Sequence, residues 1–188
     1  ISLSLTFITS PALGKFSIPP INDILIPDKY GKLVRGTRCA TTDTADDSVI
    51  RSPADPVAWK NAHASSILNI NIPIAFHIIM SSKGEGNVTD EQINQQINVL
   101  NTAYSNLGIF FTIDSIQRIK NNMFYKVQPG ITEFIMKWQL NKNPTKILNL
   151  YTADISGSIL GWSSMPWLYT ESSFMHGVVI LNQALPGG

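Results

Sequence analysis

The hydrophobic positions from residue 67 onward follow two periods, which predict alternating strands and helices. Residues 67–80 alternate as a strand does, so that successive side chains fall on opposite faces. One predicted face holds Ile74, Phe76, Ile78 and Met80, and the other holds Ala75, His77 and Ile79. Both faces are largely apolar, which is typical of a central strand covered on two sides. Pro73 lacks a backbone donor and is expected at the start of this strand or on an edge.

Residues 90–107 carry an apolar stripe at helical spacing. Its members lie four, three, four and three residues apart: Ile93, Ile97, Leu100, Tyr104 and Leu107. Thr89 and Gln92 have the spacing of an N-cap and its capping box. Gly108 is expected to end the helix.

The rest of the chain predicts shorter elements. Residues 109–116 form a second strand, residues 120–130 are irregular, and residues 131–140 form a short helix stopped by Asn143-Pro144. Further strands are expected at residues 146–155, 158–165 and 177–182. This order favours a mixed sheet in an α/β or α+β layer.

The first 66 residues lack the periodic hydrophobic pattern of the rest of the chain. Five prolines and polar runs in residues 15–66 exclude a long regular element and predict a linker or pro-segment. Residues 1–14 begin with an apolar run and end in small residues, Ala12 and Gly14, as the end of a signal peptide does. A buried strand at the start of a domain is the other interpretation of that run.

Composition narrows the function classes. The chain is 44% hydrophobic and 14% charged, with a net charge of +1, so it can bury a core. Its basic residues are scattered, which gives no electrostatic basis for binding nucleic acid. Its apolar runs are too short to span a bilayer. The sequon at Asn87 is a candidate glycosylation site and is compatible with secretion.

The sequence lacks the local signatures of common catalytic sites. Its three histidines, His63, His77 and His176, lie far apart, so no helix presents two zinc ligands on one face. His77 is expected to pack in its strand, and the other two on loops. A Ser-His-Asp triad depends on geometry rather than order, but no Gly-x-Ser-x-Gly turn is present. Nucleotide-binding glycine loops and paired carboxylates are also absent.

Residues 160–167, LGWSSMPW, combine glycine with aromatic side chains. They could form the rim of a cleft, where an exposed strand edge pairs with an extended peptide. They could equally form a hairpin whose tryptophans complete the core, and composition alone favours this second interpretation.

Taken in order, several motifs resemble one protein family. IPIAFHII at residues 72–79 is similar to the first strand of pappalysin-like zinc metalloproteases, the group that includes ulilysin and the secreted fungal metalloproteases. The stretch at residues 88–104 looks like their first long helix, and ILNLY at 147–151 like a later strand. LGWSSMP at 160–166, HGVVI at 176–180 and LPGG at 185–188 follow in the family's order. The resemblance covers residues 67–188, and RGTRCAT at 35–41 resembles an upstream family patch with Ala40 in place of glycine.

The resemblance implies a zincin-like α/β (α+β) fold, in which helices back a twisted, mixed, five-stranded sheet. It implies a secreted endopeptidase that hydrolyses peptide bonds with a zinc-activated water. In the family the zinc ligands lie on a His-Glu-x-x-His helix that would follow Gly188, and any calcium sites would also lie further on. Residues 67–188 would then be the N-terminal subdomain of the catalytic domain, without catalytic or metal-binding residues, inactive alone and prone to associate.

Two sets of residues take roles from the resemblance. The cleft rim that binds peptide or protein substrate would consist of Leu160, Gly161, Trp162, Ser163 and Ser164, with Trp162 also a candidate for the core. Cys39, the single cysteine, would ligate the zinc of an inactive zymogen. A disulfide to a cysteine outside this sequence is the competing role.

Two other functions remain open from the sequence. A secreted, non-catalytic module would keep the rim for peptide capture. An unrelated α/β fold would share the motifs by chance, and in that case the strand after Ile109 need not pair with the strand that holds Ile74.

Overall fold

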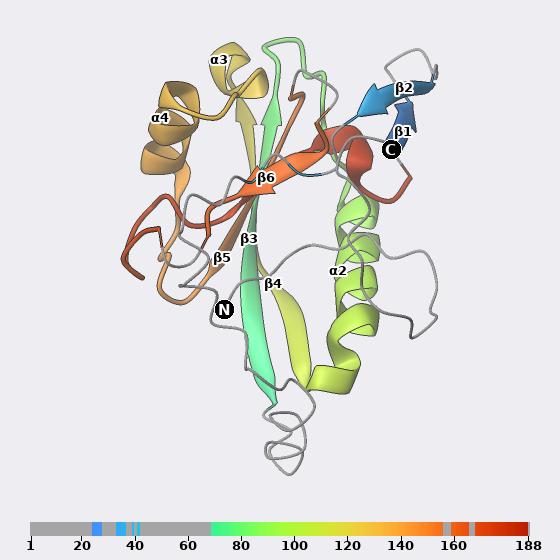
Figure 1. The fold of residues 1–188 in the computed structure, drawn as a ribbon, viewed down its shortest axis with the longest axis vertical. Coiled ribbons are helices and arrows are strands. Elements are labelled where there is room, and N and C mark those ends of the chain that lie inside the picture. Colours follow the sequence, from blue (N-terminus) through green and yellow to red (C-terminus); the bar gives the residue numbers. More distant parts are fainter. Residues whose placement is uncertain are drawn as a thin grey trace.

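A computed structural model describes residues 24–27, 33–36, 39, 41, 69–155, 159–165 and 168–187. Its main feature is one five-stranded sheet in the order β4-β3-β5-β7-β6 (Figure 1). The strands are β3 (Ile70–Met80), β4 (Ile109–Lys120), β5 (Leu148–Ala153), β6 (Gly161–Ser163) and β7 (Val178–Leu181). β3, β4, β5 and β7 are parallel, whereas β6 runs antiparallel to β7 at one edge.

Pairing of β4 with β3 removes the support for an unrelated fold. The strand after Ile109 lies beside β3 over its whole length, and Ile74 is opposite Ile113. A separate two-stranded sheet joins β1 (Ile24–Pro27) to β2 (Leu33–Gly36).

Helices cover both faces of the sheet, as the two apolar faces of β3 predict. α2 (Asp90–Tyr104) packs on the face that carries Ile74, Phe76, Ile78 and Met80. α3 (Asn122–Tyr125) and α4 (Ile131–Leu140) pack on the opposite face with Ile79 and Tyr151. Figure 1 shows α2 and the α3–α4 pair on either side of the strands. The predicted central strand is therefore confirmed.

Pro73 lies where its missing donor does least harm. β3 pairs with β4 along its whole length, but its pairing with β5 begins only at Ile74. Pro73 thus precedes the part of β3 that is bonded on both sides, which agrees with the expected position at a strand start.

The start of α2 follows the predicted capping box. The Thr89 hydroxyl accepts from the Gln92 backbone N–H at 3.2 Å, and Gln92 Oε1 accepts from the Thr89 N–H at 3.0 Å. The α-helix ends at Tyr104, a 3₁₀ turn, η2 (Ser105–Leu107), continues it, and Gly108 adopts φ 68°. Only a residue that tolerates the left-handed region fits there, so glycine ends the helix.

α2 also shields the outer edge of the sheet. The Asn101 side chain donates to the Phe111 carbonyl at 3.1 Å and accepts from the Phe111 N–H at 2.7 Å. These backbone groups belong to β4 and would otherwise face an unpaired edge. A register shift between Ile74 and Ala75 leaves Asp114 as the extra residue of a bulge further along β4.

The structure differs from the predictions at three places. β4 extends to Lys120 rather than residue 116, because its pairing with β3 continues to Met80 and an edge strand needs only one apolar face. Residues 122–125 are helical rather than irregular, since the Asn121 side chain accepts from the N–H groups of Met123 and Phe124. In addition, β6 contains only residues 161–163 of the strand predicted at 158–165.

The N-terminal predictions lie largely outside the described residues. The signal-peptide interpretation of residues 1–14 falls there completely, and so does His63. The domain boundaries at residues 14 and 66 stay predictions. None of the described helices is long and apolar enough to cross a membrane.

Candidate functional site

The antiparallel strand β6 is the last strand of the sheet in the described residues, and its outer edge is the candidate site. The Leu181 N–H donates to the Leu160 carbonyl at 2.8 Å, which makes these two residues a hydrogen-bonded pair. Such pairs alternate along an antiparallel ladder. Trp162 therefore also bonds to β7, whereas the backbone groups of Gly161 and Ser163 point away from it. Those groups face the edge at which a strand could be added.

Gly161 holds β6 unusually close to β7. A Cβ atom at this position would lie 2.5 Å from the Val179 carbonyl oxygen, nearer than real Cβ atoms come to backbone. Only glycine fits without a shift of the strand. This contact gives the glycine of the LGW motif a structural role.

The remaining predicted rim residues divide between core and surface. The Trp162 side chain is buried against α4's side of the sheet, together with Tyr151 and Val179. Leu160, Ser163 and Ser164 are half-buried. The structure thus gives the core role to the Trp162 side chain and leaves the backbone of its neighbours at the edge.

A cleft of about 440 Å³ lies beside this rim. Ser163 and Ser164 line it, as do Gly177 and Val178 from the start of β7. Its other walls come from the start of β3 and from residues 144–149 before and within β5. Glu171, Lys146 and His176 bring charged and polar side chains to it. An extended chain laid along β6 would run next to this cleft.

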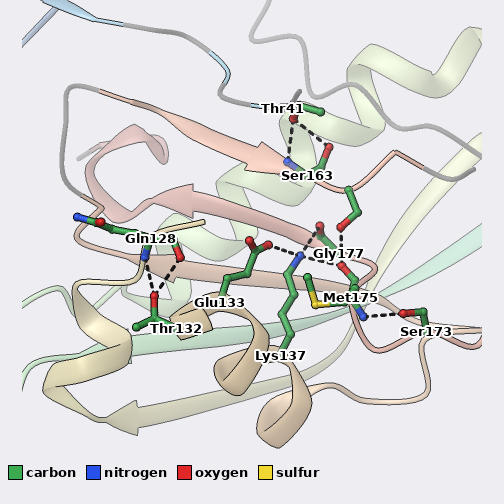
Figure 2. Close-up of polar contacts among 10 residues, drawn as sticks. Thr41, Gln128, Thr132, Glu133, Lys137, Ser163, Ser173, Met175 and Gly177 are labelled. Atoms are coloured by element: carbon green, nitrogen blue, oxygen red, sulfur yellow. Dashed lines mark hydrogen bonds and ion pairs between the residues drawn. The ribbon is translucent and has the colours of Figure 1, made fainter. Parts of the chain in front are cut away.

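Thr41, far upstream in the chain, contacts the outer edge of β6. Thr41 Oγ1 accepts from the Ser163 backbone N–H at 2.9 Å and lies 3.5 Å from the Ser163 hydroxyl. Figure 2 shows Thr41 reaching the end of the strand. Cys39 is exposed, and its Sγ lies 3.0 Å from Thr41 Oγ1. Sequence reasoning selected Cys39 but missed Thr41, because nothing local indicates which strand a distant hydroxyl will meet.

The described residues do not form a metal site. No three His, Cys, Asp or Glu side chains among them lie close enough together to hold an ion. His176 is partly exposed in the loop before β7, with Nε2 2.9 Å from the Thr170 carbonyl. His77 is buried in β3, as expected from its strand position. The part of the chain that the structure describes therefore does not fit zinc.

Burial favours the neutral form of His77 over the charged form. Its Nε2 lies 2.9 Å from Asn149 Oδ1, which also accepts from the Lys142 N–H, while Asn149 Nδ2 donates to the Lys142 carbonyl. These bonds fix the amide, so His77 Nε2 must carry the proton. The ring stacks on Tyr151 at 4.6 Å. Burial lowers the pKa of His77 below its usual 6.5, and the Asn149 bond opposes that shift only in part.

Asn87, the candidate glycosylation site, is exposed just before α2. Its Oδ1 accepts from Arg118 Nε at 3.3 Å. An intact mass measured before and after deglycosylation would test this modification, which stays a prediction.

Comparison with known proteins agrees with the resemblance seen in the motifs. The chain is 38% identical over 124 residues to an extracellular metalloprotease of Sordaria macrospora, a match that covers 63% of this chain and 42% of the relative. An extracellular metalloprotease of Neurospora crassa is 35% identical with the same coverage. The chain is a relative of the fungal extracellular metalloproteases. It spans less than half the length of these two relatives. No family model matches the chain.

Solved structures show the same fold for this metalloprotease relative. Mature mirolysin of Tannerella forsythia, in complex with a cleaved peptide, aligns with a TM-score of 0.52 and 19% identity over 62% of this chain and 54% of its own. A promirolysin mutant of the same species aligns with a TM-score of 0.53 and 17% identity over 79% and 60%. The five-stranded mixed sheet with helices is thus a fold shared with mirolysin, and the predicted fold class is confirmed.

Gly161→Ala is expected to lower the free energy of unfolding by about 1–3 kcal/mol, because the added methyl group must displace the Val179 carbonyl. Chemical denaturation measures this change. Ser172→Ala, at an exposed position of the β6–β7 loop, is the control and should have almost no effect. Equal stability of the two variants would show that β6 does not pack this closely.

His77→Phe is expected to reduce the loss of stability on acidification. The unfolded chain binds a proton at His77 near pH 6.5, whereas burial makes the folded state bind it only at lower pH. Stability therefore falls as pH drops through 6.5 toward the folded pKa. Phenylalanine can stack on Tyr151 and cannot titrate, so denaturation curves at pH 7.5 and 5.5 should differ less for this variant. An unchanged difference would mean that the fold does not lower the pKa of His77.

Proposed function

We propose that the protein is a secreted zinc endopeptidase, and that residues 67–188 supply the sheet and substrate rim of its catalytic domain. The observation that carries the proposal is the open, antiparallel edge of β6 beside a cleft. Sequence relatives named extracellular metalloproteases support the peptidase class and secretion. The fold shared with mirolysin supports the arrangement of the sheet.

The substrate would bind as an added antiparallel strand along β6. The outward backbone groups of Gly161 and Ser163 would donate to and accept from the backbone of the peptide. Each such bond contributes about 0.5–1.5 kcal/mol. Because every peptide has the same backbone, this rim holds and orients a substrate, and the adjoining cleft is the place where side chains would be selected.

Apart from Cys39 in the inactive zymogen, the ligands of the zinc would lie outside the residues that the structure describes. The described side chains do not form a site for it, so we assign its ligands and any calcium ligands to other parts of the protein. When bound, zinc supplies a water of lowered pKa and polarises the scissile carbonyl. The role left to the residues described here is to bind and orient the peptide, and the 188 residues alone are expected to be inactive.

This proposal predicts different behaviour for two proteins. The product of the complete open reading frame should bind about one zinc ion and cleave an unfolded protein substrate, and a chelator should abolish cleavage. The chain 1–188 should do neither. Metal analysis and gel assays measure both properties. If the complete protein binds extended peptides without cleaving them, the proposed peptidase function is wrong and the protein is a peptide-binding module.

We also propose that residues 15–66 are a pro-segment that keeps the enzyme inactive until it is processed. The bond from Thr41 to Ser163 supports this, because it occupies a backbone donor that a substrate strand would use. Promirolysin aligns with a larger share of this chain than mature mirolysin does, which also favours a pro-segment in the N-terminal part. Cys39, two residues away, would ligate the zinc. If it instead forms a disulfide, a reductant will expose its thiol and a chelator will not.

Thr41→Val should weaken this inhibition. Valine keeps the shape of threonine but cannot accept the Ser163 N–H, so unprocessed enzyme should show about three- to tenfold more peptide cleavage. Thr112→Val on β4 is the matched control, since the Thr112 hydroxyl bonds only to Asn71 in the described contacts. If unprocessed Thr41→Val and Cys39→Ser enzymes both stay as silent as the parent, the segment does not block the rim.

A further inference from the structure

Lys137 is an unusual lysine because its side chain is completely buried. It lies on α4, and its Nζ makes an ion pair with Glu133 Oε1 at 2.8 Å, one helical turn earlier. The same Nζ donates to the Met175 carbonyl at 2.8 Å and lies 3.4 Å from the Gly177 carbonyl. All three N–H groups of the ammonium therefore have an acceptor. Figure 2 shows the side chain pointing from the helix to this loop.

Stability does not account for this arrangement. Removing two charges from water costs several kcal/mol per ion, and apolar residues of the same volume often serve a fold equally well. The neighbours on this face include Met136 and Tyr151, so an apolar pair would be in keeping with its surroundings. What apolar side chains cannot do is hold two specific carbonyl groups.

Those carbonyls lie next to residues that line the candidate cleft, Ser164 and Gly177. The Met175 carbonyl also accepts from the Ser164 hydroxyl at 2.7 Å, and Ser164 directly follows the last residue of β6. Gly177 directly precedes β7, with φ 122°, and a Cβ atom there would lie 2.5 Å from the Asn149 carbonyl. Lys137 thus reaches the end of the rim strand through one bond and the start of β7 through another.

β6 needs such an anchor. It contains three residues, its partner β7 holds it on one side only, and the Ser163 groups that face the open edge lie at its very end. Without the bond from Ser164 to Met175, the described contacts at the end of the strand would be the pairing of β6 with β7 and the contact of Ser163 with Thr41. Short edge strands open easily because few buried contacts and bonds oppose local unfolding.

We propose that Lys137, held by Glu133, is a positioning residue of the substrate rim: it fixes the Met175 carbonyl, which fixes Ser164 and so the outward groups of Ser163. This role rests on the proposed function of β6 as the peptide-binding edge. Lys137 touches no substrate in this scheme. Its loss would loosen the bound peptide equally in the ground and transition states, which changes KM rather than kcat.

The experiment compares the parent protein with a Glu133→Leu/Lys137→Met double variant, which leaves no unpaired buried charge. Lys126→Met is the control, because Lys126 is exposed and pairs with Asp154 away from the rim. Hydrogen–deuterium exchange of the 188-residue chain measures the rim without any need for catalysis. Steady-state kinetics of the complete, processed enzyme on a peptide substrate then measure KM and kcat.

The double variant should exchange about tenfold faster in peptides that cover residues 160–165 and 174–179, with α2 unchanged. Its KM should rise about three- to tenfold, with kcat within about twofold of the parent. Unchanged exchange at the rim, or faster exchange everywhere, would overturn the positioning role. A zinc-loaded parent that cleaves no peptide would defeat the proposed function instead, and the exchange result would still decide whether Lys137 holds the rim.

Discussion

The structure depends on the complete burial of β3. This strand has neighbours along both edges and apolar side chains on both faces, so water reaches almost none of it between Ile74 and Met80. A strand in that position requires the chain to cross the sheet on each side, which α2 does on one face and α3 with α4 on the other. The strands that lead to the candidate site pair in order from β3: β5 pairs with β3, β7 with β5, and β6 with β7.

The sequence carried enough information to predict that core and the type of most elements. The period-two pattern around His77, the capping box at Thr89 and the glycine after Leu107 each express a local physical rule. The extent of β4 was not predictable from its own residues, because its second half is polar and continues only where β3 offers a partner. The helix at residues 122–125 depends on one side chain, Asn121, whose capping role is visible only once the chain turns there.

At the candidate site, too, the features with a local sequence signal were predictable, and those that depend on distant residues were not. The LGWSSMP motif drew attention to β6, and the structure adds which backbone groups face outward and that the Trp162 side chain faces inward. Glu133 and Lys137 have the spacing of an ordinary surface ion pair, and nothing in the sequence says that the pair is buried. The carbonyls that accept from Lys137 lie in a loop 38 and 40 positions later, so only the fold could bring them together. Long-range polar contacts of this kind have no local signal.

The shielding of Phe111 by Asn101 has a consequence for how the sheet can grow. With its backbone groups occupied there and a bulge at Asp114, the β4 edge resists the addition of another strand. Among the described residues, the only contact of this kind at the β6 edge is the Thr41 hydroxyl at Ser163. The two edges of the sheet therefore differ: if β6 binds a peptide as we propose, an added strand can pair only at that end, and the protected β4 edge would keep the sheet from growing in both directions.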